Sequence, residues 1–285
     1  MERIALITDS ACDIDQDTLD QYSIKILPFR IIYKNNEYID KIDITPEQIY
    51  SNMQNEIPKT SLPSMEDIDN LYKELQTNHY THVIAILISS GLSGTVNAVQ
   101  LISEQYPEIK SYIFDTKSTS LCQGLFIKEC GKLIKKGCSF DSIIKTLPQM
   151  KSKLHFYFVF GTLEYAIKGG RIGWISGTLG SLLDMKPIVG FESEFGQCYT
   201  HCKVRGRNKS LSRLIDYPNE ALQGKKLEAY IVHGNCLEDA KKVALILQQN
   251  PCIENVYIIG QISAVVGVYA GPGTLGICYW ENDSN

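Results

Sequence analysis

Serine, threonine and glycine residues gather directly after an apolar run near residue 90, and they form the first candidate site. Residues 84–88 read Ile-Ala-Ile-Leu-Ile, and residues 89–95 read Ser-Ser-Gly-Leu-Ser-Gly-Thr. The apolar run predicts a buried strand, and the apolar residues at helical spacing after Thr95 predict a helix. The turn between them can expose backbone N–H groups and hydroxyls that bind an anion. Ordinary helix capping by Ser93 or Thr95 would give the same residue types without a ligand.

Polar residues also follow two other apolar runs. Thr8-Asp9-Ser10 ends the first run of the chain, and Asp115-Thr116 ends a later one. Because strand ends of an open parallel sheet converge on one crevice, Asp9, Ser10 and the loop 89–95 are expected to face the same pocket. Ser10 and Asp13 can equally serve as helix caps.

Two loops could hold polar side chains in fixed positions. A proline in the segment 59–64, Lys-Thr-Ser-Leu-Pro-Ser, stiffens the backbone, so the hydroxyls of Thr60 and Ser61 could act as fixed donors. Two glycines precede Arg171, which suits the exposed presentation of a guanidinium group.

A second chemistry is possible at the same turn. Gly91-x-Ser93 is most of a G-x-S-x-G nucleophile elbow, and Asp115 and His233 lie at later predicted strand ends, in the order of an α/β-hydrolase triad. Position 95 is Thr where that motif has Gly, so the motif is incomplete. A serine hydrolase that uses Ser93 with Asp115 and His233 is therefore the alternative function.

The predicted elements alternate between strand and helix, which is typical of an α/β fold with a parallel sheet. A helix over 139–150 leads to a second unit with an aromatic strand over 156–160, a helix over 173–184 and a loop over 265–273 that carries Tyr269. Further strands are predicted over 186–191, 197–204, 227–233, 256–259 and 275–280. We therefore predict an N-terminal parallel α/β domain over residues 1–150 and a C-terminal α/β domain over residues 151–285.

Composition narrows the class of protein. The 285 residues are 44% hydrophobic and 21% charged, with a net charge of −4 and no massed basic residues, which argues against nucleic-acid binding. No apolar run approaches the length that spans a bilayer, so we expect no stable membrane insertion and a cytoplasmic location. The nine cysteines include no C-x-x-C pair and are expected to be reduced. Cys198, His201 and Cys202 lack a fourth ligand, so no metal site is predicted.

Five blocks of this sequence, in this order, resemble the DegV family. They are Thr8-Asp9-Ser10 with Asp13, Thr60-Ser61-Leu62-Pro63-Ser64, Ser90-Gly91-Leu92-Ser93-Gly94-Thr95, Asp115-Thr116 with Ser118, Ser120 and Gly124, and Gly169-Gly170-Arg171-Ile172. The resemblance covers nearly the whole chain. It implies a DegV-like pair of α/β domains and a carrier, not an enzyme, that binds a long-chain fatty acid as its ligand without another cofactor. It also implies an ATP-dependent bacterial fatty acid kinase as partner, to which the carrier presents the fatty acid for acyl-phosphate formation.

The resemblance also implies roles for individual residues. The resemblance implies that the fatty-acid carboxylate is held by a hydroxyl of Thr60 or Ser61 and by the turn that carries Ser93 and Gly94, both of which are included in the predicted carboxylate site. Arginines that match Arg171 and Arg205 are implicated in the phosphorylation step. Preferred chain length and unsaturation do not follow from the resemblance.

One position departs from the family pattern. Members usually have His in an H-x-G-P-G motif, whereas this chain has Tyr269-Ala270-Gly271-Pro272-Gly273. Tyrosine can still donate a hydrogen bond to the carboxylate, so Tyr269 is included in the predicted carboxylate site. It is neutral at pH 7 and lacks the positive charge of an imidazolium, so we expect phosphoryl transfer to suffer more than lipid binding.

Overall fold

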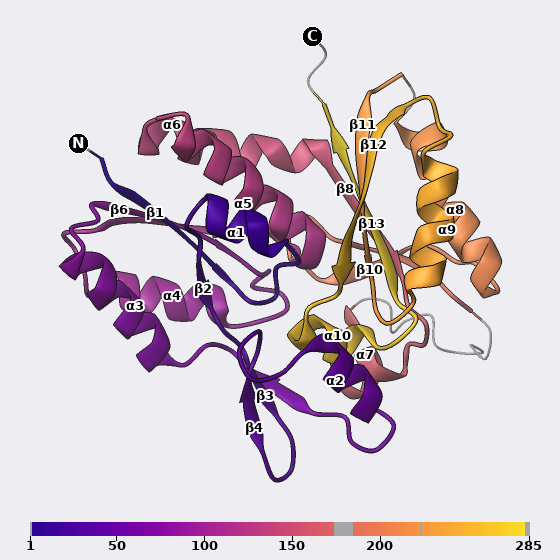
Figure 1. The fold of residues 1–285 in the computed structure, drawn as a ribbon, viewed down its shortest axis with the longest axis horizontal. Helices are drawn as coiled ribbons and strands as arrows, with labels where there is room; N and C mark the ends of the chain where they lie inside the picture. Colours follow the sequence, from indigo (N-terminus) through magenta and orange to yellow (C-terminus); the bar gives the residue numbers. More distant parts are fainter. Residues whose placement is uncertain (1, 174–184, 223, 283–285) are drawn as a thin grey trace.

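The computed structural model describes residues 2–173, 185–222 and 224–282. They form an N-terminal domain with a parallel sheet and a C-terminal α/β domain with a larger sheet, which stand side by side in Figure 1. The mixed α/β class predicted from the strand and helix alternation is confirmed. The proposed division at residues 150 and 151 falls in a 3-10 helix, η1 (Leu147–Lys153), which follows α6 (Phe140–Thr146).

The N-terminal sheet has four parallel strands in the order β2-β1-β6-β7. Their bounds are β1 (Ile4–Asp9), β2 (Lys25–Leu27), β6 (His82–Leu87) and β7 (Lys110–Asp115). Helices α3 (Met65–Thr77) and α4 (Thr95–Ser103) cover one face, and α1 (Gln16–Gln21) and α5 (Ser120–Lys135) cover the other. Because β6 lies inside the sheet with helices on both sides, nearly all its side chains are buried, which explains its continuous apolar sequence.

The C-terminal sheet has six strands in the order β10-β9-β8-β13-β11-β12. Their bounds are β8 (Leu154–Val159), β9 (Ile188–Phe191), β10 (Cys198–Cys202), β11 (Leu227–His233), β12 (Ile253–Gln261) and β13 (Leu275–Glu281). Only the β11–β12 pair is parallel. Helices α8 (Arg207–Ala221) and α9 (Leu237–Leu247) cover one face of the sheet.

The other face of the C-terminal sheet turns toward the N-terminal domain. Phe158, Tyr230 and Cys278 on this face belong to the same apolar cluster as Leu125 and Phe126 of α5. Helix α5 therefore contributes to the cores of both domains and lies between the two sheets in Figure 1.

A third sheet, which the sequence did not predict, joins the two domains. Its strands are β3 (Arg30–Ile32), β4 (Glu37–Ile39) and β5 (Lys59–Ser61), in the order β4-β3-β5. Strands β3 and β4 come before α2 (Pro46–Asn52) in the chain, and β5 comes after it. Ile31, Ile49 and Met53 from this segment pack against Tyr165 and Val268 of the C-terminal domain. This N-terminal segment is thus completed by apolar residues from the far end of the chain.

One of the local predictions differs from the structure, and another falls mostly outside the described residues. Residues 264–270 form helix α10 (Ala264–Ala270) where a loop was expected, and its apolar side chains pack into the junction of the domains. Most of the helix expected over 173–184 lies outside the described residues. Among the helices that the structure describes, none combines the length and apolar character needed to cross a membrane.

Candidate functional site

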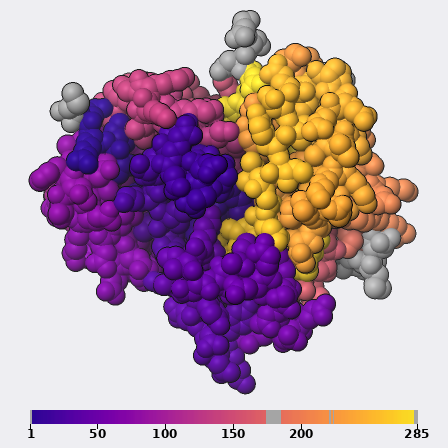
Figure 2. Space-filling model, viewed as in Figure 1, coloured from indigo at the N-terminus to yellow at the C-terminus, as the bar shows by residue number. Residues whose placement is uncertain are grey.

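A cavity of about 270 Å³ lies between the two domains. One side is formed by the loops after β5 and β6 and the start of α5, and the other by β8, β9, β13, α7 (Glu164–Lys168) and α10. Figure 2 shows the indigo N-terminal residues packed against the yellow C-terminal residues on one face of the molecule. The cavity is therefore built by segments that are far apart in the sequence.

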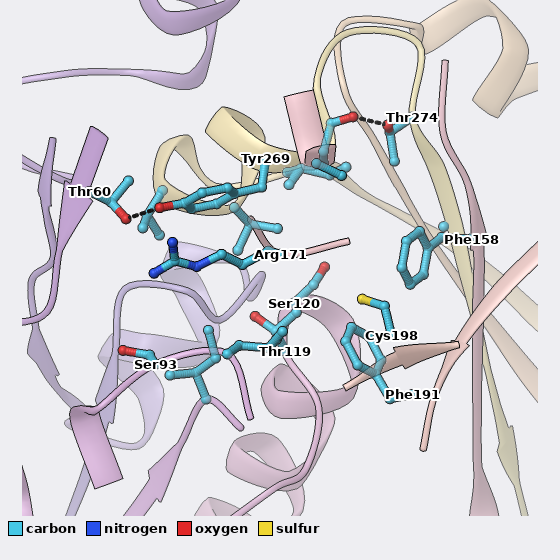
Figure 3. A pocket seen from close by; sticks show the side chains of 18 of the residues that line it. Thr60, Ser93, Thr119, Ser120, Phe158, Arg171, Phe191, Cys198, Tyr269 and Thr274 are labelled. Atoms are coloured by element: carbon cyan, nitrogen blue, oxygen red, sulfur yellow. Dashed lines mark hydrogen bonds between the residues drawn. The ribbon is translucent and has the colours of Figure 1, made fainter. Parts of the chain in front are cut away.

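Hydroxyl groups and one guanidinium group gather at one end of the cavity. Figure 3 shows the Thr60 and Tyr269 hydroxyls turned toward one another with the Arg171 guanidinium beside them, while Ser93 lies farther away on the other side of Arg171. The Thr60 and Tyr269 hydroxyl oxygens are 2.6 Å apart and form a hydrogen bond across the domain boundary. Whichever hydroxyl accepts that bond keeps its own hydrogen for a ligand.

Arg171 is held over the Tyr269 ring by its local backbone. Its guanidinium carbon lies 4.9 Å from the ring centroid, a cation–π distance, and Nη1 donates to the Gly169 carbonyl oxygen at 2.9 Å. Gly169 ends α7, and a Cβ there would come within 2.3 Å of the Tyr269 ring. Gly170 has a φ of +68°, the left-handed conformation that favours glycine. The two glycines therefore let the turn pass close to the tyrosine and aim the arginine at the cavity.

Ser93 lies in the turn between β6 and α4. Its Oγ is 2.9 Å from the Thr95 Oγ1 and also accepts a longer bond, 3.4 Å, from the Thr95 N–H. Gly94 is the N-cap of α4 and supplies no side-chain cap, so the helix start faces the cavity with backbone groups. The turn is fixed by Ser89, whose Oγ donates to the Gly196 carbonyl oxygen at 2.8 Å.

The rest of the cavity wall is mainly apolar and aromatic, and Thr119, Ser120 and Thr274 also line it. Its main contributors are Phe29, Ile88, Leu92, Phe156, Phe158, Phe160, Phe191, Val232, Ile262, Val265, Val266 and Ala270. The buried thiol of Cys198 faces the same space, between Phe158 and Phe191 in Figure 3. The cavity thus has a polar end and a long apolar remainder.

The structure brings most of the predicted site residues together. Those that line the cavity are Thr60, Ser61, Ser93, Gly94, Arg171 and Tyr269. The Ser61 hydroxyl donates to the Leu62 carbonyl oxygen at 3.3 Å, and Ser61 is exposed, so Thr60 is the better placed of the two candidates. Arg205 is exposed and is not among the lining residues.

Asp9 and Ser10 do not face this cavity, contrary to the prediction from their strand end. The Asp9 carboxylate accepts the backbone N–H groups of Ala11 and Ile88 at 3.0 and 2.8 Å. The Ser10 hydroxyl donates to Asp40 at 2.6 Å. Both side chains are fully buried and fix the ends of β1 and β6 instead of contacting a ligand.

The alternative triad receives no support from the geometry. Within the described residues, no hydrogen bond joins any two of Ser93, Asp115 and His233. Asp115 accepts from the Ser90 and Lys117 backbone N–H groups and pairs with the Lys117 ammonium at 3.0 Å. His233 is buried at the end of β11, with no hydrogen-bond partner at Nδ1 among the described residues, and burial lowers its pKa.

The residues described hold no group of three or more His, Cys, Asp or Glu placed to bind a metal ion. Cys198 faces the cavity, while the ring of His201 lies 4.6 Å from that of Tyr157.

Sequence reasoning missed the apolar wall of the site. The aromatic strand over 156–160 was predicted as a strand, but nothing in its pattern showed that Phe156, Phe158 and Phe160 line a cavity. The α10 residues were missed because their helix was predicted as a loop. A helical spacing of Val265, Val268 and Tyr269 was the available signal.

The matches to known proteins extend over almost the whole chain, so they include every segment that builds the cavity. The DegV family model, described as an uncharacterised protein family, matches residues 3–282. A DegV domain-containing protein of Clostridium acetobutylicum is 46% identical over 281 residues, which are 99% of this chain and 100% of the relative. Protein DegV of Bacillus subtilis is 32% identical over 281 residues, 97% of this chain and 98% of the relative.

Two solved structures share the fold over almost their full length. A DegV family protein from Thermus thermophilus, described by its fatty acid binding, has a TM-score of 0.91 and 27% identity and covers 98% of this chain and 100% of its own. DegV from Bacillus subtilis, described as a fatty acid binding protein, has a TM-score of 0.88 and 31% identity. The match covers 99% of this chain and 100% of the Bacillus chain.

Proposed function

Since this chain belongs to the DegV family, we propose that it binds a long-chain fatty acid in the cavity between its domains and presents it to an ATP-dependent fatty acid kinase for acyl-phosphate formation. The observation that carries the proposal is the division of the cavity into a polar end and an apolar remainder. The fatty acid binding of the Thermus and Bacillus proteins, which share the fold, supports it further.

The apolar remainder supplies most of the affinity. Burying an acyl chain gains about 0.8 kcal/mol per methylene, so a long chain is held mainly by its tail. The aromatic side chains of Phe156, Phe158 and Phe191 would contact that tail along one wall. The protein therefore acts as a carrier whose ligand is extracted from water by burial.

The polar end orients the carboxylate. Thr60, Ser93 and Tyr269 offer hydroxyl hydrogens, and Arg171 offers the positive charge that a buried carboxylate needs. Because these donors come from four different segments, only a ligand with its acidic group at this end satisfies them together. This arrangement favours a fatty acid over an uncharged lipid.

Presentation to a kinase requires that the carboxylate can be reached from outside. A second hollow of about 390 Å³ adjoins the polar end and shares Ser93, Gly94 and Arg171 with the cavity. Its other lining residues include Ser90, Gly170 and Gln197. An incoming phosphoryl group could approach the carboxylate through this hollow. We place the carrier in the cytoplasm, where its nine unpaired cysteines stay reduced.

Extraction of the purified protein tests the proposal. We expect organic solvent to release a fatty acid, identified by mass spectrometry, in near-equal molar amount to the protein. We also expect no reaction of the native protein with a serine-directed fluorophosphonate. Absence of bound fatty acid, together with failure of the lipid-free protein to bind any added one, would exclude the carrier. Labelling at Ser93 would support the hydrolase instead.

Removing the Ser93 hydroxyl should weaken binding without abolishing it. Ser93→Ala leaves the carboxylate one hydrogen bond short, which costs about 1 to 2 kcal/mol, or about 5- to 30-fold in Kd. Titration with a fluorescent fatty acid measures the change. Ser90→Ala is the matched control, because Ser90 lies in the same loop but does not line the cavity. Equal affinities for Ser93→Ala and the unsubstituted protein would remove Ser93 from the head-group site.

A further inference from the structure

Two buried carboxylates of the N-terminal domain meet the beginning of α10 in the C-terminal domain. Asp13 Oδ1 accepts the backbone N–H of Ser263, the residue just before α10, at 2.8 Å. Its other oxygen accepts the hydroxyl of Ser120, which starts α5. Asp13 therefore ties α10 to the core of the N-terminal domain by a hydrogen bond that crosses the domain boundary.

Asp40 lies beside Asp13 at the same boundary. Its Oδ2 accepts the Ser10 hydroxyl, whereas Oδ1 is buried without a hydrogen-bond partner among the residues described. Asp40 is 1% exposed. The two carboxylates line a crevice of about 190 Å³ between the domains, together with Lys41 and Ser263. The Lys41 ammonium donates to the Cys12 carbonyl oxygen at 2.9 Å and is the only cationic side chain that the described residues contribute to the crevice.

The helix held by these carboxylates is also a wall of the cavity. Val265, Val266 and Ala270 of α10 face the apolar part, and Tyr269 supplies a hydroxyl at the polar end. Movement of α10 away from the N-terminal domain would therefore separate Tyr269 from Thr60 and widen the cavity. Such a movement would also admit water to the crevice.

We propose that Asp13 and Asp40 are positioning residues of the lipid site: Asp13 holds α10 across the domain boundary through Ser263, Asp40 borders the same crevice, and the charge state of the two carboxyl groups sets how readily the domains part for ligand exchange. The inference rests on the proposed function for its link to fatty acids. The geometry of the crevice itself does not depend on that link.

The electrostatic environment gives this contact a pH dependence. Burial raises the pKa of Asp40 to about 6, against opposing effects of the Ser10 hydrogen bond and the Lys41 charge, and burial also raises the pKa of Asp13. The titratable groups that face the pair are Asp9 at the end of β1, Cys12 just after it, Lys41, and Tyr50 on α2. Burial raises the pKa of Cys12 to about 11 and raises that of Tyr50, so both stay neutral near pH 7. Burial raises the pKa of Asp9 to about 6, but its bonds stay within the N-terminal domain.

The sign of the effect follows from which state binds more protons. In the closed protein Asp40 keeps its proton up to about pH 6, whereas a hydrated carboxylate loses it near its ordinary value of 3.8. Between these values the closed state binds more protons than the parted one, so lowering the pH favours closure. As the pH rises, ionised Asp40 gains by hydration and parting becomes easier. The difference in pKa limits the effect to about 100-fold in the opening equilibrium.

Hydrogen exchange and ligand release test this together. We expect protection of the α10 amides in the ligand-free protein, after correction for intrinsic exchange, to fall at least about five-fold from about pH 5 to about pH 7.5. Release of a fluorescent fatty acid to albumin should accelerate over the same range. Asp40→Asn mimics the neutral carboxyl group and should flatten both profiles. Asp43→Asn is the matched control, because exposed Asp43 accepts a backbone N–H in the same loop and should leave both profiles unchanged.

The outcomes separate this inference from the proposed function. The role of the carboxylates would be overturned if the protein bound fatty acid but the protection of its α10 amides did not change with pH. It would also be overturned if the pH profiles of Asp40→Asn were identical to those of the unsubstituted protein. If the protection of the α10 amides changed with pH in a protein that binds no fatty acid, the inference about the interdomain contact would stand and the proposed carrier function would be overturned. The ligand's own titration appears equally in all variants, so the comparison between variants removes it.

Discussion

Gly276→Val is expected to weaken fatty-acid binding by about 30- to 100-fold. Gly276 lies in β13 on the cavity wall, where a Cβ would stand 3.0 Å from the Phe156 ring and 3.2 Å from Val232 Cγ1. Both neighbours line the cavity, so a valine pushes them into the space of the acyl chain. Loss of room for about three methylenes, at about 0.8 kcal/mol each, gives the expected change in Kd. Titration with a fluorescent fatty acid, with competition by unlabelled chains, measures it.

Gly190→Val is the control for Gly276→Val. A Cβ at Gly190 would stand 3.0 Å from the Tyr199 ring and 3.1 Å from the Tyr157 ring, so the crowding is similar. Neither tyrosine lines the cavity. Each substitution should cost about 1 to 3 kcal/mol of unfolding free energy through overpacking, but only Gly276→Val should reduce binding. If both variants bind as the unsubstituted protein does, the acyl chain does not lie against Phe156.

Arg171→Ala is expected to weaken fatty-acid binding by at least about 10-fold. Arg171 is the only cationic side chain among the described residues that line the cavity, and its loss leaves the carboxylate without a counter-charge. A hydrogen bond to a charged group is worth about 1.5 to 3 kcal/mol, and the exposure of Arg171 places the value near the lower bound. The corresponding fatty alcohol lacks the negative charge, so its affinity should hardly change. Parallel titrations with the acid and the alcohol measure the difference.

Two variants sharpen the Arg171 test. Arg171→Lys keeps the charge and should restore part of the preference for the acid, although lysine cannot reproduce the planar contact with Tyr269. Lys168→Ala removes a neighbouring charge that pairs with Glu164 and does not line the cavity, so it should leave both affinities unchanged. An equal loss of affinity for acid and alcohol in Arg171→Ala would assign Arg171 to packing and not to the carboxylate.

The parts of the fold that follow from local pattern could be predicted. The continuous apolar run of β6 indicated a strand buried on both faces, and the hydroxyl-rich turn after it was correctly placed at the start of a helix. The family resemblance then named Thr60, Ser93 and Arg171, which the structure gathers at one end of a cavity. Each of these residues lies in one of the five sequence blocks whose occurrence in order carried the resemblance.

The parts that depend on distant contacts could not be predicted. Helix α10 has only seven residues, three of them glycine or alanine, and its sequence alone suggested a loop. Its Gly267 packs closely against Tyr50, a contact that no local pattern shows. The roles of Asp13 and Asp40 depend on Ser263, which lies more than two hundred positions away. Asp9 and Ser10 were misplaced because a strand-end carboxylate fixes loops as readily as it contacts a ligand, and the pattern is the same in both cases.

The third sheet has a consequence for how the chain can be made. Ile31, Ile49 and Met53 are synthesised more than two hundred residues before Val268, which belongs to the surface that covers them. The nascent N-terminal domain therefore carries a bare apolar patch until the segment around Val268 has been made. A fragment truncated at residue 150 would keep that patch exposed, so the two halves cannot be treated as independently expressible modules.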